Sequence, residues 1–273
     1  MDPLISIITP SFQQARFLRA CIDSVLSQDY PEVEYIINDG GSDDGSVEIL
    51  KSYGDRITWT SGPDGGQAAA INTGLKRSRG AILGYLNSDD VLVPGACRAI
   101  AEAFAHHPQA DVIYGKAEMI GEDGQVLGLY RTQPTVTEEL RADCTICQPA
   151  AFWRREIQDK VGLLDESLQT ALDYDFWIRI HQSGGQFRFL DKVLAQSRDY
   201  PGTKTRRDRD LVFQEIFSIS RRHLGEINSR WIESYLHYLK FETRSPLRWL
   251  IPRTAPRRQP LVRLIRAFSR RCR

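Results

Sequence analysis

The segment AILGYLNSDDVLVP, from Ala81 to Pro94, combines an apolar run of strand length with two adjacent carboxylates. The run predicts a buried strand that ends in the polar segment Asn87-Ser88-Asp89-Asp90. Two neighbouring carboxylates at such a position repel each other unless a positive charge balances them. A divalent cation carrying a phosphate is one candidate, because such ions take one or two carboxylates plus phosphate oxygens. The alternative is a helix N-cap formed by Ser88 or Asp90.

The net charge of +1 on the 273-residue chain is unevenly distributed. Ten arginines and no acidic residue lie from Arg244 to Arg273, which leaves 26 basic and 35 acidic residues, a net charge of −9, in residues 1–243. This length is typical of an α/β enzyme domain with a short appendage. We therefore expect one domain over residues 1–205 and a helical, Arg-rich C-terminal extension over residues 206–273.

Several features favour a cytoplasmic location. A strand-like segment follows Met1 almost directly, so we expect no signal peptide, and no apolar run is long enough to span a bilayer. The five scattered cysteines fit a reducing compartment. Cys144 and Cys147 have the spacing of a redox or metal motif, but no second pair accompanies them, and we interpret the spacing as incidental.

Strand-like and helix-like segments alternate through the first half of the chain. We predict strands at residues 4–9, 33–37, 56–60 and from 81, and helices at residues 16–28, 47–53 and 67–76. This alternation predicts a doubly wound, mostly parallel α/β sheet with right-handed crossovers. Ligands bind such sheets beyond the carboxyl ends of the strands. Polar segments stand at three of these ends: Thr9-Pro10-Ser11, Asp39-Gly40-Gly41-Ser42 and Asn87-Ser88-Asp89-Asp90.

The second half is predicted to be more varied. A helix at residues 96–106 precedes short strands at 112–114, 118–120 and 126–130, with Asp123-Gly124 as a hairpin turn. A strand is expected at residues 148–154 and a helix from about Thr170 to Gln182. Short strands at 187–190 and 193–196 are followed by a helical pattern from Arg207 to about Phe241.

Five segments, in this order, resemble motifs of the family 2 inverting glycosyltransferases, which have the GT-A fold. The resemblance covers about residues 4–205. It rests on Ile5-Ser6-Ile7-Ile8-Thr9-Pro10-Ser11, Asn38-Asp39-Gly40-Gly41-Ser42-Asp43-Asp44-Gly45-Ser46, Asp64-Gly65-Gly66-Gln67-Ala68-Ala69-Ala70-Ile71-Asn72-Thr73-Gly74, Asn87-Ser88-Asp89-Asp90 and Leu172-Asp173-Tyr174-Asp175. In this family the second segment contacts the nucleotide base, the fourth binds a metal and the fifth carries the catalytic base.

The resemblance implies a role for each matching residue. Asp173 would be the catalytic base, and Asp89 would bind Mg²⁺ or Mn²⁺. The nucleotide sugar would be bound by Thr9, Pro10, Ser11, Asp39, Ser42, Gln67, Asn72, Asn87 and Ser88. Two positions depart from the family pattern: Asn87 replaces the first Asp of the metal motif, and Tyr200 stands where a His is common. The Q-x-x-R-W motif of processive synthases is absent, which favours addition of a single sugar.

Other interpretations of individual residues stay open. Asp173 could be a first-turn helix acid favoured by the helix dipole, and Asp39 an ordinary turn former. Trp153 and Trp177 could belong to the core or to an acceptor platform. The basic residues Lys204, Arg206 and Arg207 could approach the diphosphate or lie on a solvated surface.

The expected function is metal-assisted transfer of a sugar from a nucleotide-sugar donor, UDP-linked in our prediction, to a saccharide or lipid-linked acceptor in cell-surface polysaccharide or glycolipid synthesis. The alternative is a non-catalytic sugar-nucleotide-binding or scaffold protein of the same fold. A dinucleotide-dependent oxidoreductase is disfavoured because G-x-G-x-x-G is absent after the first strand.

The Arg-rich tail is a second candidate site. Over Pro260 to Arg271, an apolar helical face of Leu261, Leu264, Ile265 and Phe268 is flanked by arginines. Such a helix can lie on an anionic membrane surface, here the inner face of the plasma membrane, or pack on the acidic body of the protein. Nucleic acid is a less favoured partner, since no reader module accompanies the arginines.

Overall fold

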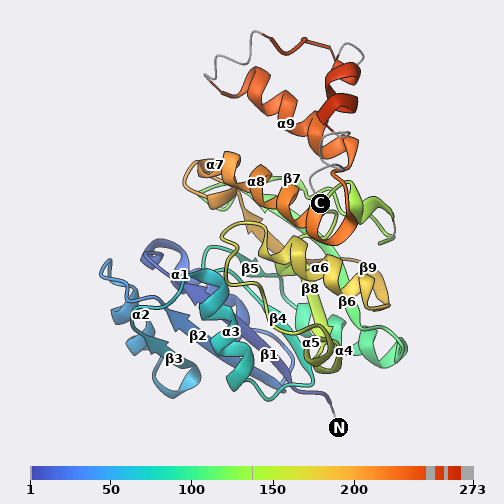
Figure 1. Cartoon of the computed structure of the whole chain (residues 1–273). Helices are drawn as coiled ribbons and strands as arrows, with labels where there is room; N and C mark the ends of the chain where they lie inside the picture. Colours follow the sequence, from blue (N-terminus) through green and yellow to red (C-terminus); the bar gives the residue numbers. More distant parts are fainter. Residues whose placement is uncertain (1, 137, 244–249, 255–257, 266–273) are drawn as a thin grey trace.

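Nine strands form one sheet in the computed structural model, which describes residues 2–136, 138–243, 250–254 and 258–265. The strand order is β3-β2-β1-β4-β8-β6-β9-β5, and β7 pairs with β6 (Figure 1). The strands are β1 (Ile5–Ser11), β2 (Val33–Asp39), β3 (Thr58–Ser61), β4 (Ile82–Tyr85), β5 (Val91–Leu92), β6 (Val112–Ile120), β7 (Val126–Leu129), β8 (Ala151–Arg154) and β9 (Phe187–Arg198).

The helices of the described residues cover the two faces of this sheet and form the C-terminal part of the chain (Figure 1). They are α1 (Ala15–Leu26), α2 (Ser46–Ser52), α3 (Gln67–Arg77), α4 (Ala96–His106), α5 (Arg155–Val161), α6 (Leu172–Gln182), α7 (Lys204–Arg207), α8 (Arg209–Ile219) and α9 (Ser229–Phe241). Short 3₁₀ turns lie at Gly54–Arg56, Glu138–Arg141 and Gln148–Ala150. None of the described helices has the length and hydrophobicity that crossing a bilayer requires.

The first half of the sheet is parallel. β1 pairs in parallel with both β2 and β4, and β2 pairs in parallel with β3. The second half is mixed, since β8 is antiparallel to β4 and β6, whereas β9 is parallel to β6. The predicted doubly wound α/β arrangement is confirmed, and the antiparallel β8 joins the parallel half to the rest of the sheet.

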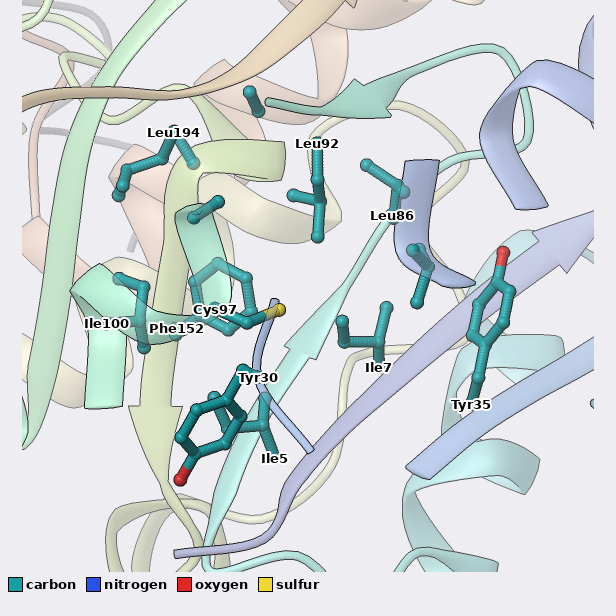
Figure 2. Packing of buried hydrophobic residues seen from close by; sticks show 14 of the residues in the cluster. Ile5, Ile7, Tyr30, Tyr35, Leu86, Leu92, Cys97, Ile100, Phe152 and Leu194 are labelled. Atoms are coloured by element: carbon teal, nitrogen blue, oxygen red, sulfur yellow. The ribbon is translucent and has the colours of Figure 1, made fainter. Parts of the chain in front are cut away.

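Apolar side chains are buried on both faces of the sheet. Along β1, Ile5 and Ile7 point to a cluster shared with α1, α2 and α4, whereas Ile8 points to a cluster shared with α3, α5 and α6. Figure 2 shows part of the first cluster, in which β1 side chains pack with others such as Cys97 and Phe152. Burial on both faces explains why β1 is a continuous apolar run rather than an alternating one.

Three predicted boundaries in the sheet are wrong. The segments predicted as separate strands at residues 112–114 and 118–120 form one strand, β6, and those at 187–190 and 193–196 form β9. The two strands pair with each other over their full length, with register shifts near Lys116 that absorb the irregular pattern. The strand expected from Gln148 begins only at Ala151, because Pro149 initiates a 3₁₀ turn and cannot donate to the ladder.

The continuous helix expected from Arg207 to Phe241 is also wrong. It is divided into α8, a π-helical turn at Ser220–Leu224 and α9. Gly225 ends the π turn with φ of 74°, a left-handed conformation that terminates helices and favours glycine. The α9 helix then starts at a local cap, where the Asn228 side chain accepts a hydrogen bond from the Arg230 amide.

The C-terminal helices form a small core of their own. Buried residues of α9 pack with residues around 251 and 262, and Phe217 on α8 contacts both this cluster and the main core. In the tail, Leu261 and Ile265 pack against this cluster, whereas Leu264 is 54% exposed. Phe268 and the arginines beyond 265 lie outside the described residues. The described part of the tail therefore packs on α9. The boundary at residues 205 and 206 stays a prediction.

Candidate active site

The turn after β2 is built around the Asp39 side chain. Asp39 is buried and faces Ser11 across the β1–β2 pair. Its Oδ2 atom accepts hydrogen bonds from the amides of Gly41 and Ser42 at 3.1 and 2.9 Å and from the Ser61 hydroxyl at 2.6 Å. Its Oδ1 atom accepts one from the Ser42 hydroxyl at 2.6 Å. These hydrogen bonds stabilise the turn, and Asp39 lies at the edge where the parallel strands end; its contact with the nucleotide stays a prediction.

An exposed aromatic residue that the sequence motifs did not single out lies beside this turn. Phe12 follows β1 directly and is 60% exposed. A Cβ atom on Gly40 would lie 3.2 Å from the Phe12 Cδ2 atom and 3.2 Å from an oxygen of Asp64. Glycine at position 40 therefore lets the turn, the aromatic ring and the Asp64 carboxylate approach one another. An exposed aromatic directly after a motif strand is the sequence signal that could have identified it.

The polar segment after β4 is held by side-chain amides from two other elements. Asn87 accepts a hydrogen bond from Gln67 Nε2, at the start of α3, at 2.7 Å. The Asn87 Nδ2 atom lies 3.3 Å from oxygens of both Asp90 and Gln148, to which it donates. Gln148, a residue missed from the sequence, in turn donates to the Tyr85 carbonyl at 2.6 Å. Asn87 therefore orients the carboxylate pair through hydrogen bonds rather than adding a third negative charge.

Burial shifts both carboxylates of this segment. Burial and the neighbouring Asp89 charge raise the pKa of Asp90 to about 8. Asp90 Oδ1 accepts the Arg198 amide at 2.8 Å, and Ser88 beside the pair is buried. Burial also raises the pKa of Asp89, against which its own backbone amide and the positive charges of Arg198 and Lys204 act. Burial and the Asp89 charge therefore favour the protonated form of Asp90, and Asp89 is the half-buried carboxylate of the pair.

Asp173 stands at the start of α6. It is the second residue of α6, half-buried, and burial raises the pKa of its carboxyl to about 6. Burial is the largest cause that raises the pKa of the Tyr85 hydroxyl and that of the Cys147 thiol. The charges of Asp173 and Asp90 raise both of these pKa values further. The two carboxylates therefore lie within electrostatic reach of the same buried groups, although they are far apart along the chain.

The neighbouring Asp175 has a structural environment. It is 1% exposed and accepts hydrogen bonds from Arg179 at 2.7 Å and from His223 at 2.8 Å. Burial would raise its pKa, but these hydrogen bonds from His223 and Arg179 lower it overall. Asp173 and Asp175 thus differ sharply in environment, one with a raised pKa and one held as an ion pair.

Several predicted site residues have their polar groups occupied inside the protein. The Thr9 hydroxyl is buried and lies 3.0 Å from that of Tyr35. Asn72 donates to the Leu164 carbonyl and the Glu166 carboxylate, both at 2.9 Å, and accepts the Leu164 amide at 3.0 Å. Asn72 therefore fastens the loop before α6 to α3. Pro10 and Ser11 are buried at the end of β1, and the Ser11 hydroxyl has no hydrogen-bond partner in the part of the chain that the structure describes.

The structure also shows where the two tryptophans and the three basic residues singled out in the sequence lie. Trp153 and Trp177 are fully buried with ring centroids 5.8 Å apart, which puts both in the core. Arg206 and Arg207 pair with Asp199 and Asp208. Of the three basic residues, Lys204 lies next to the polar segment after β4: its Nζ atom donates to Oε1 of Gln67, the residue that also donates to Asn87, at 2.9 Å.

The aromatic Tyr200, at the position where the family pattern often has His, lies in the same neighbourhood. Its ring centroid is 5.2 Å from that of Phe17, and its hydroxyl acts to lower the pKa of the Asp89 carboxyl against the effect of burial. A separate groove of about 450 Å³ lies between α1, the β6–β7 turn and β9, and none of the predicted site residues lines it.

The donor set limits how a metal ion could be held. Among the described residues, no group of three His, Cys, Asp or Glu side chains could hold a metal ion unaided. Mg²⁺ sites in nucleotide enzymes usually have one or two carboxylates and take the rest of their ligands from phosphates and water. Asp89, half-buried and acted on by the positive charges of Arg198 and Lys204, fits that kind of site.

Comparison with known proteins identifies the family. Residues 6–161 match the family model described as glycosyl transferase family 2. The chain belongs to this family. An uncharacterised glycosyltransferase of Rickettsia felis is 30% identical over 255 residues, which are 88% of this chain and 39% of the relative. The chondroitin synthase of Pasteurella multocida is 27% identical over 194 residues, 70% of this chain and 20% of that protein. This family 2 chain thus spans well under half the length of these relatives.

Solved structures support the fold. S. aureus TarS matches with a TM-score of 0.69 at 16% identity, covering 98% of this chain and 54% of that chain. The complex of TarS residues 1–349 with UDP-GlcNAc matches at 0.64 and 19% identity, covering 94% and 78%. The mannosyltransferase PcManGT of Pyrobaculum calidifontis, with GDP-Man and Mn²⁺, matches at 0.57 and 14%, covering 99% and 73%. The family 2 chain therefore has the GT-A fold predicted from its motifs.

Proposed function

We propose that this family 2 chain transfers a sugar from a UDP-linked donor to a hydroxyl group of a saccharide or lipid-linked acceptor, with inversion at the anomeric carbon. The observation that carries the proposal is that Asp90 and Asp173, from two segments far apart in the chain, both raise the pKa of the buried Tyr85 hydroxyl and of the Cys147 thiol, so that both act on the groups at the end of β4. An inverting displacement needs a leaving-group site and a base on opposite sides of the reacting carbon, and two separate segments can supply them.

In this proposal Asp173 accepts the proton of the acceptor hydroxyl. As the acceptor oxygen bonds to the anomeric carbon, the bond from that carbon to the diphosphate breaks, and the nucleoside diphosphate leaves with the electron pair. A half-buried carboxyl with a pKa of about 6 is ionised at neutral pH and basic enough for this role. Lys204, tied to Gln67 at 2.9 Å, is the cation that can reach the leaving diphosphate.

Asp89 would hold the Mg²⁺ or Mn²⁺ ion together with the diphosphate. When bound, the ion would act as a Lewis acid that stabilises the negative charge of the leaving group. Asn87 and Gln148 contribute by orienting the segment, since their amides form hydrogen bonds with Asp90 and with the Tyr85 carbonyl. The UDP and UDP-GlcNAc complexes of TarS support the choice of a uridine donor.

The setting of the reaction is proposed from the relatives and the tail. The chondroitin synthase relative supports a role in polysaccharide or glycolipid assembly. The Arg-rich tail supports contact with the inner face of the plasma membrane, since the exposed Leu264 and nearby arginines suit an anionic lipid surface. The two-unit division into residues 1–205 and 206–273 belongs to the same proposal.

A panel of nucleotide sugars tests the function. Thermal unfolding with each donor and Mn²⁺ is expected to show the largest rise in melting temperature with one UDP-sugar, because a ligand that binds only the folded state stabilises it. Release of UDP is then measured with saccharide acceptors. If no donor stabilises the protein, and none is hydrolysed or transferred, the enzymatic proposal is wrong, and stabilisation without turnover would favour the non-catalytic alternative.

Phe12 is expected to stack on the uracil base. Replacing Phe12 by Ala should weaken UDP binding by about tenfold, because stacking of a base on an aromatic side chain contributes roughly 1–3 kcal/mol. Titration calorimetry with UDP measures the effect. Phe241→Ala removes another exposed phenylalanine, 52% exposed in α9, and should leave UDP binding unchanged. Equal affinity of Phe12→Ala and the unmodified chain would exclude the stacking role.

A further inference from the structure

The loop before α6 is anchored by a carboxylate from a distant helix. Glu215 on α8 is 8% exposed, and its Oε1 atom accepts the Gln169 amide at 2.7 Å. Its Oε2 atom accepts the amides of Thr170 and Ala171, both at 2.9 Å, and the Thr170 hydroxyl at 2.7 Å. One buried side chain therefore fixes three consecutive backbone amides of this loop.

These amides stand at the N-terminus of α6. Ala171 is the N-cap residue, whose own side chain cannot cap the helix, and the Tyr174 amide of the first turn donates to Asp173 Oδ1 at 2.8 Å. The first amides of a helix have no partner within it, and an anion at this end is favoured by the helix dipole. The Glu215 carboxylate binds the amide of this N-cap residue and the amides of the two residues before it. Asp173 follows Ala171 by two residues. The hydrogen bond from the Ala171 amide to Glu215 therefore fixes the backbone close to Asp173.

We propose that Glu215 is a positioning residue for Asp173: by binding the amides of residues 169–171, it sets the direction in which α6 presents the Asp173 carboxylate to the acceptor. The proposal rests on the proposed function of Asp173 as base. It gives the C-terminal helices a part in the reaction, although none of their side chains would touch the substrate through this contact.

The residues just after Asp173 have partners from the same C-terminal segment. The Tyr174 hydroxyl accepts a hydrogen bond from Trp231 Nε1 at 3.1 Å, and Asp175 is 2.8 Å from His223 Nε2. The start of α6 is therefore held on both sides of Asp173 by residues from α8 to α9. Of these contacts, only the one made by Glu215 involves residues that precede Asp173 in the chain. It is also the one that binds backbone amides.

The test compares Glu215→Gln with two other variants. Glutamine has the same shape but presents an NH₂ group to donors, so at least one amide of the loop loses its acceptor. We expect kcat to fall tenfold or more, with KM for the donor and Kd for UDP within twofold of the unmodified chain. Glu215→Asp keeps the charge and should recover part of kcat. Amide hydrogen exchange at residues 169–173 should be faster in Glu215→Gln.

The matched control is Glu233→Gln. Glu233 also belongs to a C-terminal helix and accepts a hydrogen bond at 2.9 Å, from Arg258, but it has no contact with the loop before α6 among those described. This variant should keep kcat and the exchange pattern at residues 169–173, whatever its effect on melting temperature. Equal losses of kcat in both variants would reduce the effect of Glu215 to general stability and overturn the proposal.

Two further outcomes decide the inference separately from the proposed function. Glu215→Gln with kcat within twofold of the unmodified chain overturns the positioning role. If the unmodified chain transfers no sugar, the proposed function fails, and hydrogen exchange alone then decides the anchoring. Faster exchange at residues 169–173 in Glu215→Gln supports the anchor, and unchanged exchange overturns it.

Discussion

Asp173→Asn is expected to lower the rate of sugar transfer by on the order of 10³-fold and to leave UDP binding within twofold. General bases contribute roughly 10²–10⁴-fold to catalysis, and the asparagine amide cannot accept the acceptor proton. The donor would be bound at other residues, so its affinity should not depend on this carboxylate. Rates of UDP release with acceptor, together with calorimetry of UDP binding, measure the two quantities separately.

Stability provides the first control for this variant. The pKa of Asp173 in the folded chain, about 6, is higher than the ordinary value of 3.8, so folding favours the protonated form. This contribution to stability is present below pH 3.8 and is lost as the pH rises through 6. Near neutral pH the ionised, half-buried carboxylate opposes folding, and a neutral amide removes that cost. Asp173→Asn should therefore unfold at the same denaturant concentration as the unmodified chain, or at a higher one.

The pH dependence of transfer provides the second control. The base acts only when it is ionised, so kcat/KM should rise with pH and reach half its plateau near pH 6. Asp173→Asn should lack this rise in its residual activity. Asp175→Asn, by contrast, should lower stability because it breaks the buried contacts with Arg179 and His223. A parallel loss of UDP binding and transfer in Asp173→Asn would remove this residue from the role of base.

Asp89→Ala is expected to abolish the effect of Mn²⁺ on UDP binding. For the unmodified chain, Mn²⁺ should tighten UDP binding by about tenfold or more, which corresponds to ~1.4 kcal/mol. Asp89 is the carboxylate proposed to hold the ion, so the variant should bind UDP equally with and without Mn²⁺. Transfer should fall on the order of 10²-fold or more, because the leaving group loses its charge stabilisation.

A carboxylate outside the site serves as the control for Asp89. Asp123→Ala, in the exposed β6–β7 turn, removes the same charge without touching the 87–90 segment. It should retain the full Mn²⁺ effect in calorimetry. Metal-independent UDP binding of equal strength in the unmodified chain would contradict a metal role for Asp89, and a metal effect that survives in Asp89→Ala would place the ion elsewhere.

Local patterns predicted much of the fold and of the candidate site. The apolar run of β4 and the polar residues that follow it, the Asp123-Gly124 turn and the start of α6 near Thr170 are all short-range features, and the structure has each of them. Strand alternation with helices also led to the parallel order of β1 to β4. These elements depend on residues close together in the sequence, so periodicity and turn chemistry are enough to predict them.

Burial and long-range partners were decided only by the tertiary structure. From the sequence, Trp153 and Trp177 could belong either to the core or to an acceptor platform. In the structure, packing between β8 and α6 buries both. Asn72, predicted in the donor pocket, is bonded to Leu164, which is 92 positions further along the chain. Such contacts have no local period, because they arise only when separate elements pack against each other.

The same division applies to the candidate active site. The sequence determined which acidic residues follow the strands and stand at the start of α6, because turns and helix starts depend on neighbouring residues. The tertiary structure decided that Asp90 and Asp173 both act on the buried Cys147 thiol. It also decided that Glu215, 44 positions after Ala171 in the chain, binds the Ala171 amide. Hydrogen bonds and electrostatic interactions depend on distance in space. Only folding determines which residues come close enough to act on one another at the site.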